Sequence, residues 1–254
     1  MDGVPRRHAL VTGGGKGIGL AIAAAFSAQG IAVSIVGREQ AALEAAVSQG
    51  KARAAIVADV TDVASVQAAV KEAERQAPID ILVNNAGGVE TGPFRRLDDA
   101  VFERQLMLNL MGTVRMTRAV LAGMAARGFG RIINIASTAG LKGYAYVTAY
   151  VAAKHAVIGF TRALALEMAK QGVTVNALCP GYTDTDLVHR SVDKLSARTG
   201  GSTEGVLAEL TSANPQGRLV RPLEVAAAAL WLASLEAASV TGQAIAIDGG
   251  ETAA

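Results

Sequence analysis

The sequence contains a single cysteine, Cys179, among its 254 residues. One thiol can form neither a disulfide within the chain nor a zinc site built from cysteines. The three histidines, at positions 8, 155 and 189, do not have the spacing of metal ligands, so we expect no metal site. Any chemistry of this chain is therefore expected from other residue types.

An excess of one charge and a long apolar run are also missing. The 24 Lys and Arg residues against 22 Asp and Glu residues give a formal charge of +2, and the basic residues are scattered, which argues against nucleic-acid binding. The longest apolar run, residues 225–233, is far shorter than the roughly 20 residues of a membrane helix. The first residues have no apolar segment typical of a signal peptide. We therefore expect a cytoplasmic protein that binds no membrane.

Aromatic residues are scarce, at 4%, whereas glycine is abundant, with 28 residues. This balance favours close backbone packing and glycine-dependent turns over aromatic binding platforms. The composition, 51% hydrophobic and 18% charged, is that of an ordinary globular protein. The length is sufficient for one large domain with a sizeable core.

Apolar segments of strand length alternate with helical segments along the whole chain. The expected strands are residues 8–12, 31–36, 54–58, 79–83, 131–136, 173–178 and 244–247. A regular β-α-β-α alternation is typical of a parallel sheet that is covered by helices. The sequence therefore predicts a single α/β domain over residues 1–254, a doubly wound Rossmann-type fold with about seven parallel strands and helices on both faces.

Residues 184–217 depart from this pattern because their composition is polar, with a Gly-Gly-Ser sequence at residues 200–202. We expect two short helices that form a substrate lid, rather than a separate domain. If the first of them is helical, Arg190, Lys194 and Arg198 form a basic stripe. Such a stripe suits the phosphates of coenzyme A, but it is also compatible with a solvated face that nearby aspartates partly balance.

One short segment carries the residues of an acid–base site. Tyr150 follows Ser137 by 13 positions, and Lys154 lies one helical turn beyond Tyr150 on the same face. Lowering a phenol pKa from about 10 to neutrality requires about 4 kcal/mol. One ammonium about 4 Å away supplies roughly this amount before desolvation opposes it. Lys154 alone is therefore barely sufficient, and the positive charge of an oxidised nicotinamide ring would help. A chance Tyr-x-x-x-Lys in a helix, with the tyrosine in the core, is the alternative.

A glycine-rich turn follows the first expected strand. Gly13, Gly17 and Gly19 give a G-x-x-x-G-x-G spacing that opens a helix of small residues. Glycines let the backbone approach a pyrophosphate, and the N–H groups of a helix N-terminus favour an anion. The alternative is a tight strand–helix turn without a ligand. We expect dinucleotide contacts from Gly13, Gly15, Lys16, Gly17, Ile18 and Gly19.

Further motifs stand at the ends of expected strands, where ligands of open α/β sheets bind. They are Asp59-Val60, the Asn-Asn-Ala-Gly sequence at residues 84–87, and Pro180-Gly181 followed by Thr185. Each is also compatible with a helix cap or a turn. In this order, and together with the glycine-rich turn, Ser137 and Tyr150-x-x-x-Lys154, they resemble the short-chain dehydrogenase/reductase family over essentially the whole chain.

The resemblance implies reversible hydride transfer between a secondary alcohol and NAD(P). Tyr150 would be the general acid in reduction and the general base in oxidation. Lys154 would lower the phenol pKa and bind the nicotinamide ribose, and Ser137 would hydrogen-bond the substrate oxygen. Asn109, within a helical segment at residues 99–127, would kink that helix and support a proton relay through water. The implied cofactor contacts beyond the glycine-rich turn are Asp59, Val60, Asn85, Ala86, Gly87, Tyr150, Lys154, Pro180, Gly181, Thr183 and Thr185.

The end of the second strand decides between NADP and NAD. Enzymes that use NAD usually place a carboxylate there to bind the ribose 2′-hydroxyl, but this chain has Gly37 and Arg38. Glu39 lies one residue further, where the N-terminus of a helix suits it. Arg38 offers a planar fork for a 2′-phosphate, and Lys16 adds a second charge. We therefore expect NADP, although NAD is possible because Arg38 could also stack on the adenine of either cofactor.

The small-molecule substrate and the assembly are less constrained. The basic stripe and the family's many 3-ketoacyl reductases favour a 3-hydroxyacyl or 3-ketoacyl thioester, such as one of coenzyme A. A cyclic alcohol, sugar, polyol or steroid remains an alternative. A catalytically silent dinucleotide sensor is a distant one, because Ser137, Tyr150 and Lys154 are all present. The family resemblance also implies a homo-oligomer, a dimer or a tetramer, built on the helices at 99–127 and 147–170.

Overall fold

Residues 7–253 are described in the computed structural model, apart from the side chains of Lys194, Arg198 and Thr199. The strands form one parallel seven-stranded sheet with the order β3-β2-β1-β4-β5-β6-β7. They are β1 (His8–Thr12), β2 (Ala32–Gly37), β3 (Ala54–Val57), β4 (Ile81–Asn84), β5 (Gly130–Ile135), β6 (Val173–Pro180) and β7 (Ala244–Ile247). The predicted fold class is confirmed, and each predicted strand lies within two residues of its observed bounds.

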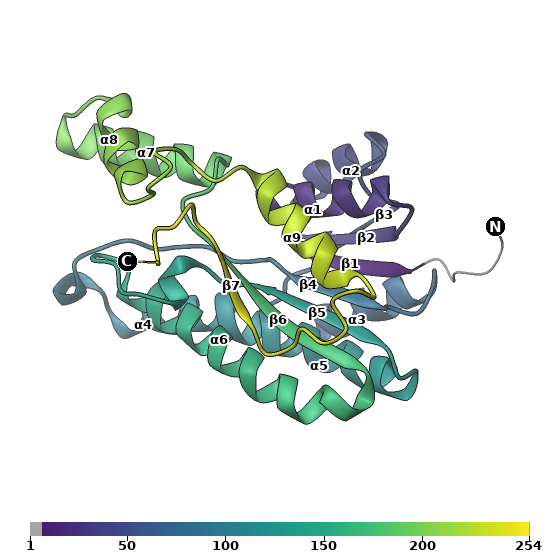
Figure 1. Cartoon of the computed structure of the whole chain (residues 1–254). Helices are drawn as coiled ribbons and strands as arrows, with labels where there is room; N and C mark the ends of the chain where they lie inside the picture. Colours follow the sequence, from purple (N-terminus) through teal and green to yellow (C-terminus); the bar gives the residue numbers. More distant parts are fainter. Residues whose placement is uncertain (1–6, 254) are drawn as a thin grey trace.

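Helices cover both faces of the sheet. The α-helices are α1 (Gly17–Ala28), α2 (Gln40–Ser48), α3 (Val63–Glu74), α4 (Asp99–Leu106), α5 (Gly112–Ala126), α6 (Thr148–Met168), α7 (Asp186–Thr199), α8 (Thr203–Ser212) and α9 (Pro222–Ala233). Figure 1 shows α1, α2 and α9 over one face and α3, α5 and α6 over the other. The strand order reverses between β1 and β4, and ligands of such sheets bind at this point beyond the carboxyl ends of the strands.

Two apolar cores explain why the strands are continuous hydrophobic runs. In β1, Ala9 and Val11 belong to the core under α1 and α9, whereas Leu10 belongs to the core under α3 and α5. Successive side chains of a strand point to opposite faces, so a strand buried on both faces needs apolar residues at every position. The alternation of strands and helices in the sequence therefore follows directly from burial.

The segment predicted as one helix at residues 99–127 is interrupted. A π-helical turn, Met107–Met111, separates α4 from α5 and contains Asn109. Gly112 begins α5 against Val60, and a Cβ at Gly112 would come within 2.8 Å of the Val60 side chain. Such π turns are frequent at functional sites. The predicted distortion near Asn109 is confirmed.

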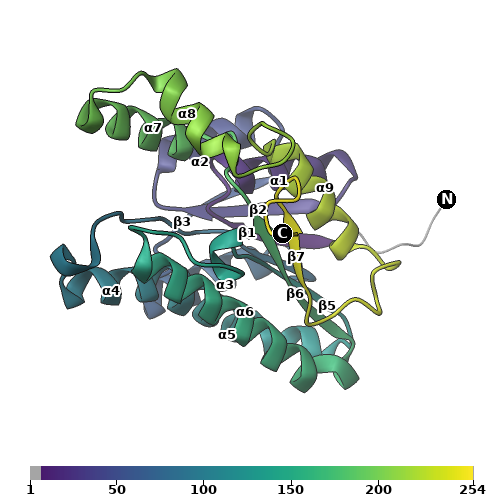
Figure 2. The same ribbon diagram turned by 60° about the vertical axis from the view of Figure 1, so that its left-hand side comes forward.

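The polar segment after β6 forms the expected pair of short helices, α7 and α8. Figures 1 and 2 show this pair projecting from the body of the protein. Because β6 leads directly into α7, the pair stands at the carboxyl edge of the sheet. We refer to α7 and α8 as the lid.

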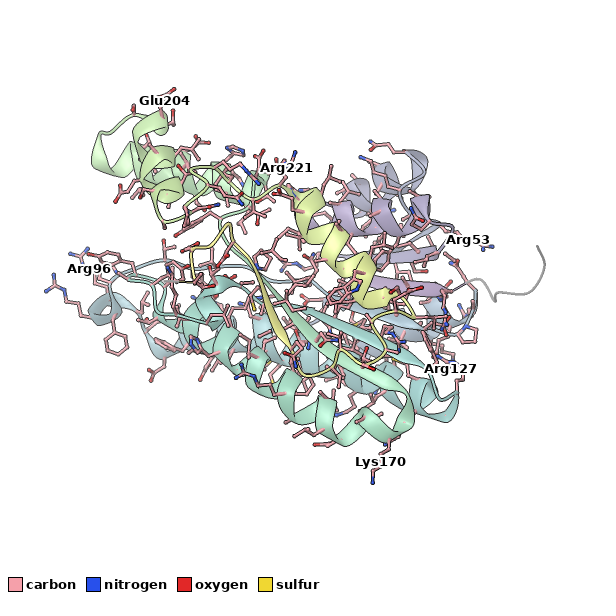
Figure 3. All side chains as sticks on the ribbon, viewed as in Figure 1. Arg53, Arg96, Arg127, Lys170, Glu204 and Arg221 are labelled. Carbon is pink, nitrogen blue, oxygen red and sulfur yellow. The ribbon has the colours of Figure 1, made fainter. Side chains whose placement is uncertain are left out.

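Charged side chains are distributed over the surface. Arg53, Arg96, Lys170 and Glu204, for example, point outward from different parts of the molecule (Figure 3). This distribution agrees with the scattered basic residues of the sequence. Within residues 7–253, none of the helices combines the length and the apolar character that crossing a membrane requires.

Candidate active site

Ser137 lies immediately beyond the carboxyl end of β5. It caps a short 3-10 turn, Thr138–Gly140, and its Oγ accepts a hydrogen bond from the backbone N–H of Ala139 at 3.1 Å. Tyr150, near the start of α6, is hydrogen-bonded to the Ser137 side chain. The structure thus brings together the two hydroxyl groups that are 13 positions apart in the sequence.

Lys154 lies one turn further along α6 and is only 5% exposed. Its Nζ donates a hydrogen bond to the carbonyl oxygen of Ile135 at 2.8 Å and lies 5.5 Å from the centre of the Tyr150 ring. Burial lowers the pKa of Lys154 to about 8. The amine therefore still carries its charge at neutral pH, next to the phenol.

The pKa of Tyr150 differs from the sequence expectation that Lys154 lowers it towards neutrality. Burial raises this pKa to about 12, while the hydrogen bond from Ser137 acts in the opposite direction. The physical reason is that desolvation disfavours the phenolate, and the Lys154 ammonium points to the Ile135 carbonyl rather than to the hydroxyl. A phenol with this pKa stays protonated at neutral pH, so it is a proton donor.

Asn109 holds the loop after β4 from the π turn. Its buried side chain donates to the Gly88 carbonyl at 2.9 Å and accepts from the Gly88 N–H at 3.2 Å. A Cβ built on the preceding Gly87 would lie 2.7 Å from Asn109 Oδ1 and 3.7 Å from Lys154 Nζ. Asn109 and Lys154 are therefore close to the same glycine, as the resemblance implied. The water relay remains a prediction.

The glycine-rich turn between β1 and α1 tolerates no side chains at its key positions. Gly13 and Gly17 have φ angles of +64° and +52°, which L-residues rarely adopt. A Cβ on Gly13 would lie 2.7 Å from Asn85 Nδ2, and one on Gly19 would collide with the Gly13 carbonyl. The backbone at the start of α1 is therefore bare enough for close approach of a pyrophosphate.

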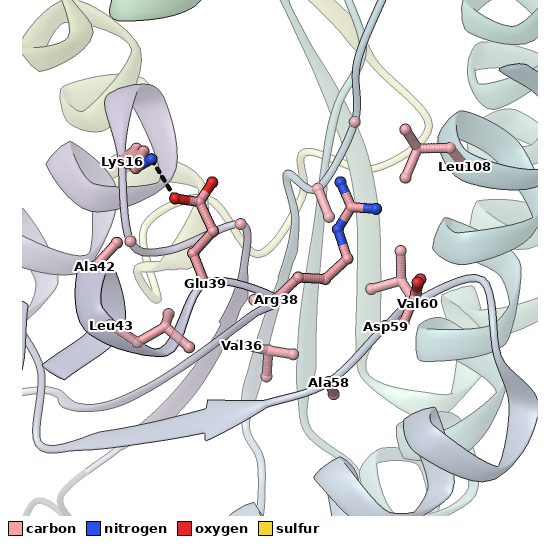
Figure 4. Close-up of a pocket in the computed structure, with 15 residues that line it drawn as sticks. Lys16, Val36, Arg38, Glu39, Ala42, Leu43, Ala58, Asp59, Val60 and Leu108 are labelled. Carbon is pink, nitrogen blue, oxygen red and sulfur yellow. Dashed lines mark hydrogen bonds and ion pairs between the residues drawn. The ribbon is translucent and has the colours of Figure 1, made fainter.

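A cavity of about 230 Å³ extends from this turn across the ends of β2 and β3 (Figure 4). Eight of the predicted cofactor residues line it: Gly13, Gly15, Lys16, Arg38, Asp59, Val60, Ala86 and Gly87. The prediction missed Val36, Gly37, Glu39, Ala42, Leu43, Ala58 and Leu108, which also line it. Most of these are ordinary apolar residues beside the motifs, and their sequence carries no signal beyond that proximity.

The charges in this cavity are arranged differently from the expectation. Lys16 is paired with Glu39, with Nζ 2.5 Å from Oε2, so it does not stand free for a 2′-phosphate. The hydrogen bond from Lys16 lowers the pKa of Glu39 most, and Arg190 of the lid adds a smaller Coulombic effect. The pairing arises because Glu39 precedes α2 and turns towards the glycine-rich turn, while Arg38 extends into the cavity (Figure 4). Arg38 is therefore the main cation for a phosphate.

Two of the predicted cofactor residues are occupied by structural contacts. Asn85 Nδ2 donates to the carbonyls of Thr12 and Gly13 at 3.0 and 3.2 Å, which ties the end of β4 to the end of β1. The Ile18 side chain packs against the core under α1. Both residues shape the turn, and contacts from their backbone to a cofactor remain a prediction.

Asp59 and Val60 serve as a cavity wall and as part of a turn at once. The Asp59 carboxylate accepts from the Thr61 N–H and hydroxyl at 2.8 and 2.7 Å, and these hydrogen bonds lower its pKa. The next helix, α3, is capped by Asp62, whose side chain accepts from the Ser65 N–H. The helix cap is therefore Asp62, whereas Asp59 and Val60 line the cavity, and their contact with a cofactor remains a prediction.

The segment from Pro180 to Thr185 leads from β6 into the lid. Thr183 is buried and donates to the Gly181 carbonyl at 3.0 Å, and the Thr185 hydroxyl donates to the Thr183 carbonyl at 3.2 Å. A Cβ on Gly17 would lie 3.2 Å from the Thr185 side chain. The base of the lid therefore faces the glycine-rich turn, where the resemblance expects these residues to hold a nicotinamide.

The sequence prediction also missed aromatic residues on the substrate side. Tyr144 and Tyr182 pack edge to face with ring centres 6.4 Å apart, and the Coulombic effect of Tyr182 adds to the high pKa of Tyr150. Cys179 on β6 is hydrogen-bonded to the Ser137 backbone, and burial raises its pKa to about 11. Tyr182 directly follows the Pro180-Gly181 motif, and this position in the sequence was the signal that could have identified it as a residue of the site.

The residues present fit a nicotinamide dinucleotide. The glycine cradle, the cavity with Arg38 and the group of Ser137, Tyr150 and Lys154 lie along one edge of the sheet. The cradle suits a pyrophosphate, the guanidinium suits a 2′-phosphate, and the two hydroxyls suit the oxygen of an alcohol or ketone.

Comparisons with known proteins agree with this geometry. The model of the family described as short chain dehydrogenase matches residues 7–196. Galactitol 2-dehydrogenase (L-tagatose-forming) of Cereibacter sphaeroides is 43% identical over 96% of this chain and 94% of its own. Acetoacetyl-CoA reductase of Shinella zoogloeoides is 40% identical over 96% of this chain and 98% of its own. The crystal structure of a variant of actinorhodin polyketide ketoreductase with NADPH superposes with a TM-score of 0.94, at 38% identity and 99% coverage of both chains.

Proposed function

The chain belongs to the short-chain dehydrogenase family and is an oxidoreductase that interconverts alcohols and ketones with a nicotinamide cofactor; on this premise we propose that it reduces a 3-ketoacyl thioester to the 3-hydroxyacyl thioester with NADPH. The observation that carries this proposal is the place of the Tyr150 phenol beside Ser137 and Lys154. Burial raises the pKa of Tyr150 to about 12, so Tyr150 holds a proton that it can donate to a ketone oxygen.

The mechanism assigns one task to each catalytic side chain. The Ser137 hydroxyl binds the ketone oxygen and stabilises the negative charge that develops on it. Tyr150 donates its proton to the same oxygen as general acid. The charge of Lys154, 5.5 Å from the phenol ring, stabilises the phenolate that remains. The nicotinamide cofactor supplies the hydride when it is bound.

The cofactor preference rests on Arg38. Its guanidinium lies in the cavity beside Asp59 and Val60, where an adenosine ribose with a 2′-phosphate fits. Glu39 is held by Lys16, which reduces its repulsion of a phosphate. The related polyketide ketoreductase structure contains NADPH, and this supports the same choice here.

The thioester assignment is supported by a relative and by the lid. Acetoacetyl-CoA reductase is 40% identical to the chain. The α7 helix gives Arg190 the helical position that the basic stripe requires, whereas the side chains of Lys194 and Arg198 lie outside the described residues. The electrostatic effect of Arg190 on Glu39 indicates that this end of the stripe lies near the cofactor cavity. The position of Arg190 therefore supports binding of a phosphate-bearing ligand.

A second candidate function is oxidation of a polyol. The wall beside Ser137 is rich in polar groups, with Thr138, Lys142 and Tyr144 in one hydrogen-bonded cluster around Glu251. Such a wall suits a substrate with several hydroxyl groups. The galactitol 2-dehydrogenase relative, at 43% identity, supports this alternative.

Initial rates followed by NADPH absorbance test both candidates. Acetoacetyl-CoA, a cyclic ketone and galactitol are each assayed with NADP(H) and NAD(H). We expect the highest kcat/KM for acetoacetyl-CoA with NADPH. A higher value for galactitol establishes the second candidate instead, and tight NADPH binding without turnover of any compound identifies a dinucleotide sensor. Assembly into a homo-oligomer remains a prediction of the family resemblance.

A further inference from the structure

A cluster of polar side chains around one buried carboxylate, beside the catalytic serine, has no part in the mechanism above. Its centre is Glu251, beyond β7, whose side chain is only 1% exposed. The Tyr144 hydroxyl donates to Glu251 Oε1, and the Lys142 ammonium lies 3.1 Å from the same oxygen. A buried carboxylate is costly unless it is paired and hydrogen-bonded, so these two contacts stabilise Glu251 in this position.

The cluster is joined to the catalytic turn through Thr138, the residue directly after Ser137. The hydroxyl oxygens of Thr138 and Tyr144 are 2.7 Å apart. Tyr144 therefore has a hydrogen-bond partner on both sides, and its hydroxyl donates to the Glu251 carboxylate. Glu251 is thus connected through Tyr144 and Thr138 to the turn that carries Ser137.

Glu251 also faces the segment at the base of the lid. A Cβ built on Gly181 would lie 3.2 Å from Glu251 Oε2. The next residue, Tyr182, packs edge to face against Tyr144. One carboxylate thus touches both segments that flank the catalytic hydroxyls, the one after β5 and the one after β6.

The turn that carries Glu251 is itself rigidly built. The Asp248 carboxylate accepts from the N–H groups of Gly250 and Thr252, both at 2.9 Å, and from the Thr252 hydroxyl at 2.6 Å. These hydrogen bonds fix the backbone of residues 248–252 independently of Tyr144 and Lys142. Glu251 is therefore presented from a preorganised turn.

We propose that Glu251 is a positioning residue that fixes Tyr144 and Lys142 as one wall of the substrate pocket. Lys142 lies beside Thr138 in the turn after Ser137, and its ammonium has two N–H groups beyond the bond to Glu251, so it recognises a hydrogen-bond acceptor close to the reacting ketone. The only proton of the Tyr144 hydroxyl is donated within the cluster, so Tyr144 holds the wall in shape. The second carbonyl of a 3-ketoacyl thioester is such an acceptor. The inference rests on the proposed function, because the wall acts on the ketone that Ser137 and Tyr150 bind. Glu251 acts on substrate affinity and does not touch the reacting atoms.

The test separates KM from kcat in Glu251→Gln and Tyr144→Phe, with acetoacetyl-CoA as the ketone. Glu251→Gln keeps the size of the side chain but removes the charge that holds Lys142, and Tyr144→Phe removes the hydroxyl. Because hydrogen bonds to charged groups are the stronger ones, we expect KM to rise about tenfold or more in each, with kcat changed less than about threefold. The dissociation constant for NADPH, measured by fluorescence, is expected to be unchanged.

Two controls distinguish positioning from a general structural role. Thr252→Val removes a hydrogen bond of the same turn without touching Tyr144 or Lys142, and its KM is expected to stay at the wild-type value. The double variant Glu251→Gln/Tyr144→Phe is expected to have a KM close to that of the more affected single variant. Both changes disrupt the same hydrogen-bonded cluster, so their effects do not add. An equal rise of KM in Thr252→Val, or full additivity in the double variant, overturns the proposal.

A second readout does not depend on turnover. Acetylation of Lys142, followed by mass spectrometry, is expected to be faster in Glu251→Gln than in the wild type, because the ammonium loses its partner. If the wild-type enzyme reduces no ketone, the proposed function fails, and an unchanged Lys142 labelling rate then overturns the role of Glu251 separately. An unchanged KM in an active Glu251→Gln enzyme overturns it as well.

Discussion

The two edges of the sheet both bury ionisable groups, but they use them differently. At the carboxyl edge, Lys154 is buried and Tyr150 is half-buried beside Ser137 and Gly87, and Gly87 lines the cofactor cavity. At the opposite edge, His8 at the start of β1 is 1% exposed, and burial lowers its pKa. Desolvation perturbs the pKa in all three groups, so the perturbation alone does not distinguish the edges.

The difference lies in where the polar atoms are directed. His8 Nδ1 donates to the Ala77 carbonyl at 2.8 Å, and its Nε2 accepts from the Ser34 hydroxyl at 2.9 Å. Arg131, also at this edge, is 3% exposed, donates to the carbonyls of Gly130 and Ser234, and stacks on Phe129. These groups bond to neighbours within the protein, which stabilises the fold.

At the carboxyl edge, Tyr150 is only half-buried, and the neighbouring Lys154 lies beside Gly87, which lines the cofactor cavity. The hydroxyls of Ser137 and Tyr150 bond to each other there. They can therefore exchange their bond for one to a substrate. A shifted pKa thus marks a functional site only where polar groups converge beside accessible space. The following predictions test this contrast, from the largest expected effect to the smallest.

Tyr150→Phe is expected to lower kcat about 10²–10⁴-fold, because the general acid is lost. The melting temperature and the NADPH dissociation constant are expected to stay close to wild type. Steady-state kinetics and thermal unfolding of the same preparation measure both quantities. Wild-type activity in this variant would show that Tyr150 is not the general acid and that the chemistry does not take place at this edge.

His8→Phe is expected to show the converse. It leaves the Ser34 hydroxyl and the Ala77 carbonyl without their partner, which costs about 1–3 kcal/mol of unfolding free energy. Its kcat is expected to be unchanged, and the exposed His155→Gln is the matched control with little effect on stability. Urea unfolding gives the difference. A loss of kcat at full stability would contradict the contrast between the edges.

Arg38→Asp is expected to reverse the cofactor preference. Replacing a guanidinium by a carboxylate removes a charge-assisted bond to the 2′-phosphate and adds repulsion, so kcat/KM with NADPH falls about tenfold or more relative to NADH. Kinetics with both cofactors measure the ratio. A wild type that prefers NADH would show that Arg38 does not select the 2′-phosphate of NADPH.

The alkaline side of the activity profile is expected to follow Lys154. Its pKa is about 8, so the ammonium loses its proton above this pH and no longer stabilises the phenolate. We expect kcat for ketone reduction to fall up to about tenfold per pH unit above pH 8. In Lys154→Arg, which keeps its charge, this decline is expected to disappear from whatever activity remains.

The acid side of the stability profile is expected to follow His8. The folded protein binds a proton there less tightly than the unfolded chain, whose imidazole has the ordinary pKa of 6.5. The stabilisation is therefore fully present above about pH 6.5 and is lost as the pH falls below it, by at most about 1.4 kcal/mol per pH unit. Unfolding free energies of wild type and His8→Phe between pH 7 and pH 5 reveal the difference. Parallel profiles would show that His8 does not contribute.

The sequence by itself determined the strands and the group of catalytic side chains. A strand buried on both faces is mainly apolar, as the centres of β1 and β5 are, and its buried polar residues, such as His8 and Arg131, are hydrogen-bonded. Tyr150 and Lys154 are one helical turn apart, so their proximity follows from local geometry. Gly13, Gly17 and Gly19 were identifiable from their spacing directly after the first strand, and the structure adds that a Cβ at Gly13 or Gly19 would collide with its neighbours. These features depend on short stretches of chain.

Only the tertiary structure decided the charges and the walls of the site. The Lys16–Glu39 pair spans 23 positions, and the Tyr144–Glu251 bond spans 107. The pKa of Tyr150 rises rather than falls because side chains from other elements exclude water around it. Pairing and desolvation depend on which distant residues meet in space, and no periodicity or spacing in the chain encodes those meetings.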